Sequence, residues 1–172
     1  RVSKLIGASY FFPFVSVTAT ESLMMTASRA SGITVLKNAA CEPEIRALAD
    51  YLNQCGAKIS GAGTNTIRIE GVPALRAGTY TMIPDRIETG MFAILAAATR
   101  SDITIAQCNP EHIESLLAVF NAMGVPYERA TDTLIMRASR ARAYQSPKKV
   151  IMNHLPFLQK SGMKENMIFY PG

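Results

Sequence analysis

The chain repeats one helical pattern, and this repeat constrains the fold more than any other feature of the sequence. The string "GITVLKNAACEPEI" is followed about 70 residues later by "SDITIAQCNPEHI". In and after each string, apolar residues recur at steps of 3, 4, 7 and 10, which is the spacing of an amphipathic helix. The first set is Ile45, Leu48, Ala49, Leu52 and Cys55, and the second, 68 residues on, is Ile113, Leu116, Leu117, Phe120 and Met123. Two copies of one structural unit are therefore predicted.

The ends of both helices carry matching signals. Pro43 and Pro110 stand near the two helix starts, where a missing N–H has no cost. Gly56 and Gly124 follow the two stripes, and glycine commonly occupies the first position after a helix. These signals predict where each of the two helices begins and ends.

A predicted strand pair follows each helix. In the first copy "AKIS" and "TIRIE" flank the turn "GAGTN", and in the second "VPYE" and "TLIM" flank "RATD". A further helix precedes each copy, at "TESLMMTASRA" and "IETGMFAILAAAT". We predict two units, at about 14–82 and 83–140, each reading helix, strand, helix, strand, strand, with a leading strand in front. One such unit cannot bury both faces of its sheet, so each needs a partner unit.

Both leading helices are expected to open on a capping box. "TATE" places Glu21 three residues after Thr18, and "DRIE" places Glu88 three residues after Asp85. In such a box the first side chain accepts from an unpaired backbone N–H, and the glutamate bonds back to the N–H of the cap. The boxes predict helix starts at Thr18 and Asp85.

Arg86 is not explained by capping, because a cation in the first turn opposes the helix dipole. It needs a carboxylate or an anionic ligand as its partner. Glu42 and Glu44, in "EPEI" at the start of the second helix, are candidates for an ion pair across the units. We favour this structural pair over a role in ligand binding, because charge pairs between structural elements are common.

Composition limits the classes of function. Hydrophobic residues make up 48% and charged residues 18%, as in globular proteins, and no apolar run reaches the roughly 18 residues of a membrane span. Residues 137–172 contain seven Lys or Arg and one Glu, a net charge of +6. Because the whole chain has a net charge of +5, residues 1–136 have a net charge of −1. A near-neutral body argues against nucleic-acid binding. The chain starts at Arg1 without a signal-peptide pattern, so we expect a piece of a longer protein.

The cysteines and histidines show no metal-ligand spacing. Cys41, Cys55 and Cys108 are odd in number and form no CxxC motif. We expect reduced thiols in a cytoplasmic protein, all three structural, because buried cysteines behave as small hydrophobic residues. His112 and His154 have no second ligand at metal spacing, so no metal site is predicted.

Three longer strings resemble a known family. They are "FVSVTATESLMMTA", "NAACEPEIRALADYLNQCGAKISGAGTNTIRIEGV" and "IPDRIETGMF", and they resemble the UDP-N-acetylglucosamine 1-carboxyvinyltransferases, or enolpyruvyltransferases, from about Phe11 to Met136. The resemblance implies an α/β (α+β) fold of repeated βαβαββ units, the inside-out α/β barrel or prism, here incomplete at both ends. It implies that residues 1–82 belong to the lobe with the catalytic loop and residues 83–172 to the second lobe. The chain would cross between the lobes near "IPDRIETG".

The same resemblance implies an activity. It is the transfer of enolpyruvyl from phosphoenolpyruvate to the 3-hydroxyl of UDP-N-acetylglucosamine, by addition and elimination, at the first committed step of peptidoglycan precursor synthesis. No metal or organic cofactor is implied. The implied partners are the two substrates and the missing remainder of the two-lobe chain, and the composition predicts neither a nucleic-acid partner nor a membrane span.

The resemblance assigns some residues to the substrate site. Phe14, Val15, Ser16 and Val17 match a family segment that lines the UDP-N-acetylglucosamine site, and Thr18 adjoins it. A segment directly ahead of a helix offers N–H groups and the positive dipole end to a diphosphate.

Four further residues, Glu42, Glu44, Asp85 and Arg86, match positions near the cleft. The sequence departs from the family at three positions. The family often has Gly where this chain has Thr18, Asn where it has Ser22, and Arg where it has Cys41.

No residue of this chain matches a catalytic residue of the family. The catalytic cysteine loop would lie before Arg1 and the base-like aspartate beyond Gly172, so the chain alone is expected to be inactive.

Two other interpretations stay open. A non-catalytic binding or scaffold module with the same fold is favoured by Cys41 and by the divergent basic residues 138–172. An RNA-end-processing relative would need a nucleophilic histidine and a basic cleft, and His112 is poorly placed for it.

Overall fold

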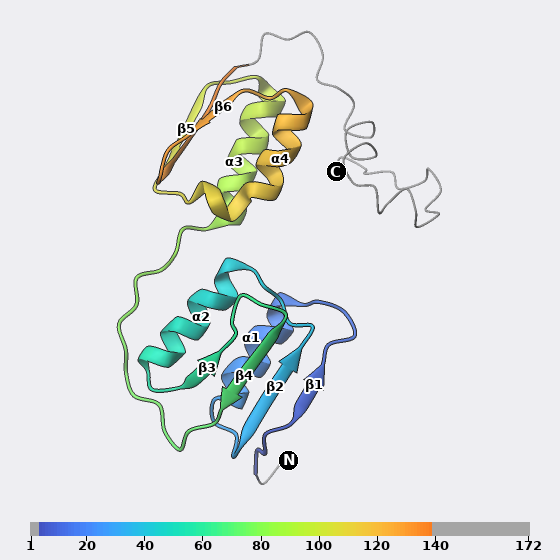
Figure 1. The fold of residues 1–172 in the computed structure, drawn as a ribbon. Helices are drawn as coiled ribbons and strands as arrows, with labels where there is room; N and C mark the ends of the chain where they lie inside the picture. Colours follow the sequence, from blue (N-terminus) through green and yellow to red (C-terminus); the bar gives the residue numbers. More distant parts are fainter. Residues whose placement is uncertain (1–3, 139–172) are drawn as a thin grey trace, which may run out of the picture. The chain divides into compact units, whose positions relative to one another are not determined.

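The computed structural model describes residues 4–138 and divides the chain into two compact units between Ile83 and Pro84 (Figure 1). Each unit is described by itself. The basic stretch 139–172, with His154, lies outside the described residues. The assignment of residues 1–82 and 83–172 to two lobes stays a prediction.

The first unit has the order β1 (Ser9–Phe11), α1 (Val17–Ala27), β2 (Ile33–Lys37), α2 (Pro43–Gln54), β3 (Lys58–Ser60) and β4 (Thr66–Glu70). Its sheet has the order β1-β2-β4-β3, with β1 parallel to β2 and the other pairs antiparallel. This is the predicted βαβαββ unit, with its leading strand before residue 14.

One face of this sheet is buried beneath the two helices. Side chains alternate along β4, where Ile67 and Ile69 have no exposed surface, as expected for a strand with one face covered. Helices α1 and α2 contact each other and lie against the same face of the sheet (Figure 1). Their apolar stripes, with Met24 and Ile45 fully buried, complete the core of this unit.

The second unit begins directly with a helix. Its order is α3 (Arg86–Thr99), β5 (Ile103–Ala106), the 3-10 helix η1 (Pro110–Ile113), α4 (Glu114–Met123), β6 (Tyr127–Arg129) and β7 (Thr133–Met136). The sheet is antiparallel with the order β5-β7-β6, and both α-helices lie on one of its faces (Figure 1). The leading strand predicted for this unit is absent among residues 4–138, because the segment 71–85 runs without regular structure into α3.

The helix starts correct one prediction and confirm another. Helix α1 is capped by Ser16, whose Oγ accepts a hydrogen bond from the Ala19 N–H at 3.3 Å, so the predicted cap at Thr18 is wrong. Thr18 lies within the first turn instead. Asp85 caps α3 as predicted and accepts from the N–H groups of Ile87 and Glu88 at 2.7 and 3.1 Å.

The structure confirms the internal repeat at the level of hydrogen bonds. The buried Thr20 donates from Oγ1 to the Ser16 carbonyl at 2.7 Å, and the buried Thr89 donates to the Asp85 carbonyl at 2.8 Å. After β2 and β5, the residues Asn38 and Gln107 both adopt a left-handed conformation, with φ of 56° and 53°. The two units therefore match at the starts of their leading helices and at the residues that follow β2 and β5.

The predicted ends of the repeated helices are also confirmed. Gly56 and Gly124 have φ of 100° and 72°, values that a residue with a side chain rarely adopts. Helix α3 ends differently, because Arg100 takes the left-handed position with φ of 54°. Within residues 4–138, none of the helices is both long and apolar enough to traverse a lipid bilayer.

Candidate functional site

The predicted binding segment, Phe14–Thr18, runs from the loop after β1 into the first turn of α1. Phe14 and Val15 are 74% and 55% exposed, so their side chains do not anchor the segment in the core. Ser16 has extended backbone angles and caps the helix, and Val17 and Thr18 form the start of its first turn. The segment thus presents the unpaired N–H groups of a helix start next to an open surface.

Helix α1 differs from the other α-helices of residues 4–138 in the charge at its start. Its cap is the neutral Ser16, and no acidic residue lies in its first turn. The first turns of α2, α3 and α4 contain Glu44, Glu88 and Glu114. The positive end of the α1 dipole is therefore not offset by a carboxylate in the first turn of its own helix, which favours an anion there.

A second loop, residues 38–42, lies against the start of α1. Strands β1 and β2 are parallel, so their carboxyl ends meet at one edge of the sheet. The Phe12 N–H donates to the Lys37 carbonyl at 3.0 Å, and Asn38 Nδ2 donates to the Phe12 carbonyl at 2.9 Å. The Ala40 N–H donates to Thr20 Oγ1 at 3.1 Å.

These hydrogen bonds bring the region of Glu42 and Glu44 to the same edge of the sheet as Phe14–Thr18. Glu42 caps α2 without a side-chain hydrogen bond to the helix. Its Oε2 atom is buried and has no hydrogen-bond partner among the described residues. Glu44 lies in the first turn of α2. A carboxylate oxygen with no donor has lost its hydration without compensation, which is costly unless a ligand or another part of the protein supplies one.

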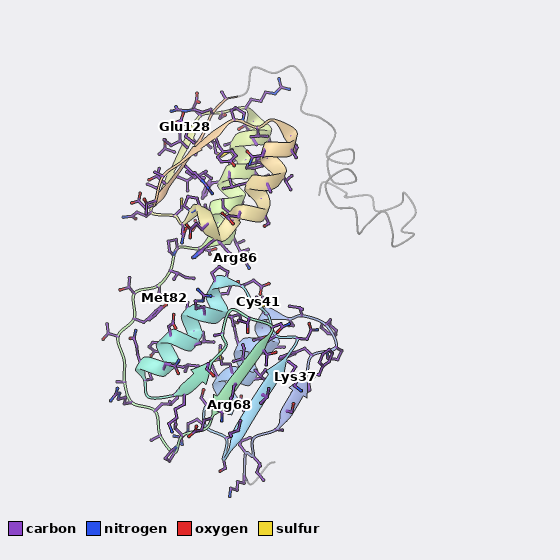
Figure 2. All side chains as sticks on the ribbon, viewed as in Figure 1. Lys37, Cys41, Arg68, Met82, Arg86 and Glu128 are labelled. Atoms are coloured by element: carbon purple, nitrogen blue, oxygen red, sulfur yellow. The ribbon has the colours of Figure 1, made fainter. Side chains whose placement is uncertain are left out.

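Cys41 precedes Glu42 and is exposed, so the prediction of a buried, structural thiol is wrong for this residue (Figure 2). Its Sγ lies 3.6 Å from the Ala39 carbonyl oxygen. The prediction holds for Cys55 and Cys108, which are buried. Burial raises the pKa of the Cys108 thiol and keeps it protonated.

The candidate residues of the second unit, Asp85 and Arg86, lie at the start of α3 (Figure 2). Asp85 is occupied as the helix cap and also lines a pocket of about 200 Å³. The pocket is lined by Pro84, Asp85, Glu88, Thr89, Phe92 and residues 105–108. The ion pair of Arg86 with Glu42 or Glu44 stays a prediction.

Two residues that organise the site were not predicted from the sequence, namely Thr20 and Asn38. Their hydrogen bonds join residues that are 20 and 26 positions apart, so no local pattern reveals them. The available signal was that Thr20 lies on the same helical stripe as the apolar residues Met24 and Ala27. Among residues 4–138, no group of three or more His, Cys, Asp or Glu side chains is arranged to hold a metal ion.

Comparison with known sequences connects this geometry to a family. The family model described as EPSP synthase (3-phosphoshikimate 1-carboxyvinyltransferase) matches residues 1–160. The UDP-N-acetylglucosamine 1-carboxyvinyltransferase of Bdellovibrio bacteriovorus is 47% identical over 131 residues, which are 76% of this chain and 32% of the relative. That of Desulfosudis oleivorans is 54% identical over 114 residues, 66% of this chain and 27% of the relative. The chain thus spans about a third of the length of these relatives.

Solved structures show the same fold at low sequence identity. The enolpyruvyl transferase NikO from Streptomyces tendae superposes with a TM-score of 0.70 at 19% identity, over 83% of this chain and 37% of that chain. The EPSP synthase from Acinetobacter baumannii gives a TM-score of 0.58 at 17% identity, over 86% of this chain and 35% of that chain. The α/β fold of enolpyruvyl transferases expected from the sequence is confirmed.

Proposed function

The chain belongs to the EPSP synthase (3-phosphoshikimate 1-carboxyvinyltransferase) family, and we propose that it is part of a UDP-N-acetylglucosamine 1-carboxyvinyltransferase. One observation carries the proposal: relatives with that name are 43–54% identical to this chain over 114–157 residues. The proposed reaction transfers enolpyruvyl from phosphoenolpyruvate to the 3-hydroxyl of UDP-N-acetylglucosamine, at the first committed step of peptidoglycan precursor synthesis. The protein then acts in the cytoplasm, and its three free cysteines agree with a reducing compartment.

The segment Phe14–Thr18 is the proposed contact with UDP-N-acetylglucosamine. The start of α1 supports this role, because it has no acidic residue in its first turn, and the helix N–H groups and the dipole together favour a diphosphate. A negative charge at a helix start is stabilised by roughly 0.3–1 kcal/mol. This helix therefore provides only part of the affinity, and other groups of the complete site must provide the rest. Glu42, Glu44, Asp85 and Arg86 stay predictions as residues of the cleft.

The chemistry proceeds by addition and then elimination. The 3-hydroxyl of the sugar loses its proton to a base as its oxygen bonds to C2 of phosphoenolpyruvate, while an acid adds a proton to C3, which gives a tetrahedral intermediate. Loss of a proton from C3 and cleavage of the bond between C2 and the phosphate oxygen then release phosphate and restore the double bond. These steps need an acid and a base. We assign neither to this chain and expect no turnover from it alone.

A non-catalytic module with the same fold is the alternative. The observation that favours it is Cys41, at a position where the resemblance implies that the family often has an arginine. An exposed neutral thiol there cannot replace a cation that contacts a phosphate.

Calorimetric titration of the 172-residue chain tests the proposal. We expect UDP-N-acetylglucosamine to bind and shikimate 3-phosphate, the acceptor of the other branch of the family, not to bind. The reverse preference would contradict the assignment. A phosphate-release assay with both substrates should show no turnover. Turnover would contradict the prediction that this chain alone is inactive because it contains neither the catalytic acid nor the catalytic base.

A further inference from the structure

The hydroxyl of Thr20 joins the two segments of the candidate site in the first unit. Thr20 is fully buried, donates to the Ser16 carbonyl at 2.7 Å and accepts from the Ala40 N–H at 3.1 Å. Ser16 lies at the centre of the proposed binding segment, and Ala40 lies in the loop that leads to Glu42. A single side chain therefore connects the start of α1 to the start of α2.

Within the binding segment, the half-buried Val17 packs against the core of the first unit, at the start of α1. The side chains of Phe14 and Val15 project into solvent, so packing does not fix their backbone. Asn38 supplies a second connection through its hydrogen bond to the Phe12 carbonyl, just before the segment. Two side-chain hydrogen bonds, one to Thr20 on α1 and one from Asn38 on the 38–42 loop, thus connect the two segments in addition to the packing of α1 on the core.

We propose that Thr20 is a positioning residue for UDP-N-acetylglucosamine, which holds the N–H groups of Phe14–Thr18 in place without touching the ligand. This inference rests on the proposed function, because it assigns Thr20 to the same substrate site. Binding groups held in place before the ligand arrives lose less entropy on binding than mobile groups. Removal of the hydroxyl leaves the buried Ala40 N–H without an acceptor, and the loop must move to find one.

The competing explanation is that Thr20 only stabilises the core. Ser28 offers a matched control, because it is also fully buried, caps the C-terminal end of α1 and donates from its hydroxyl to the Met24 carbonyl at 2.9 Å. It lies at the opposite end of the helix from the binding segment. The substitution Ser28→Ala therefore removes a comparable hydrogen bond at a distance from the site.

The experiment compares the wild-type chain with three variants, Thr20→Val, Thr20→Ser and Ser28→Ala. Valine keeps the branched shape and loses both hydrogen bonds, whereas serine keeps the hydroxyl. The first readout is the Kd for UDP-N-acetylglucosamine by calorimetry. We expect Thr20→Val to weaken binding by about tenfold, and Thr20→Ser and Ser28→Ala to stay within about twofold of the wild type.

A second readout needs no ligand. Backbone order parameters from ¹⁵N relaxation should fall by about 0.1 over residues 14–18 in Thr20→Val, from a rigid value of about 0.85, and stay unchanged in Ser28→Ala. The positioning role is overturned if Thr20→Val and Ser28→Ala have equal order parameters over residues 14–18. It is also overturned if the two variants lose equal affinity for UDP-N-acetylglucosamine. If Thr20→Ser loses as much affinity as Thr20→Val, the hydroxyl is not the cause and the inference also fails. If the wild-type chain does not bind the nucleotide sugar, the proposed function fails for this site, and the order parameters still decide whether Thr20 positions the segment.

Discussion

Ser16 and Asp85 occupy equivalent positions in the two units, 69 residues apart, and each caps the leading helix of its unit. The bonding is alike, because Ser16 Oγ accepts from a backbone N–H of the first turn and Asp85 Oδ1 accepts from two. The charge differs, since one cap is a neutral hydroxyl and the other a carboxylate. The fold therefore accepts either residue as a cap, and the neutral choice at Ser16 leaves the start of α1 open to an anion.

The substitution Ser16→Asp separates capping from binding. Aspartate caps helices as well as serine does, so the free energy of unfolding should change by less than about 0.5 kcal/mol. A carboxylate close to the diphosphate should weaken binding of UDP-N-acetylglucosamine by about tenfold or more, because two like charges 4 Å apart repel by about 1 kcal/mol even in water. Urea unfolding and calorimetry measure the two effects. Unchanged affinity would show that the nucleotide sugar does not approach Ser16.

Two glycine substitutions should change stability in opposite directions. In Gly71→Ala the new Cβ would overlap the backbone carbonyl of Ala30, which cannot move away within the packed first unit. We expect a loss of about 3 kcal/mol in the free energy of unfolding. In Gly90→Ala the new Cβ would lie 3.4 Å from a methyl group of Leu116, an ordinary contact, within helix α3.

Because alanine favours a helix over glycine, Gly90→Ala should stabilise the second unit by about 0.5–1 kcal/mol. Urea denaturation followed by circular dichroism tests both variants. A destabilised Gly90→Ala would mean that α3 is packed more tightly at this point than the structure shows.

The ion pair between Lys58 and Glu70 should be visible in an NMR titration. The two residues face each other across β3 and β4, with Lys58 Nζ 2.7 Å from Glu70 Oε1. The hydrogen bond from Lys58 and its charge hold the pKa of Glu70 below its ordinary value, and Arg68 contributes a smaller effect in the same direction. Because the folded state lowers this pKa, the pair stabilises the fold above the pKa of the unfolded chain. The stabilisation is lost as the pH falls through the folded value.

Lys58→Met should therefore raise the pKa of Glu70 towards its ordinary value, and Arg68→Met should raise it less. Both partners are largely exposed, so added salt should reduce the shift. A larger effect of Arg68→Met would contradict the geometry of this pair.

The three thiols should differ in reactivity. Cys41 is exposed, whereas Cys55 and Cys108 are buried with 5% and 4% of their surface accessible. With a thiol reagent such as Ellman's, we expect one equivalent to react rapidly in the native chain and two only after unfolding. Cys41→Ser should abolish the rapid phase. A rapid phase that persists in this variant would show that one of the other two thiols is open to solvent.

Local patterns predicted most of the fold. The stripes that begin at Ile45 and Ile113 identified helices correctly, because an amphipathic helix buries one face whatever its neighbours are. The helix start at Thr18 was predicted wrongly because Ser16 and Thr18 are both good caps. The choice depends on the extended backbone at Ser16, which the sequence does not specify.

The site was less predictable than the fold. The segment Phe14–Thr18 was predicted through family resemblance and stays a prediction, but its connections to Thr20 and Asn38 depend on hydrogen bonds between distant segments. The exposure of Cys41 also depends on the conformation of its loop, and its residue type alone favoured burial. Interactions between elements, rather than within them, thus account for what the sequence did not reveal.

One measurement tests most directly whether this chain is a working part of a UDP-N-acetylglucosamine 1-carboxyvinyltransferase. The 131-residue stretch that matches the Bdellovibrio bacteriovorus relative can replace the corresponding stretch of that protein, and phosphate release from phosphoenolpyruvate can be followed. We predict that a folded chimera releases phosphate only when UDP-N-acetylglucosamine is present. A folded chimera that releases none, or that uses shikimate 3-phosphate instead, would contradict the account.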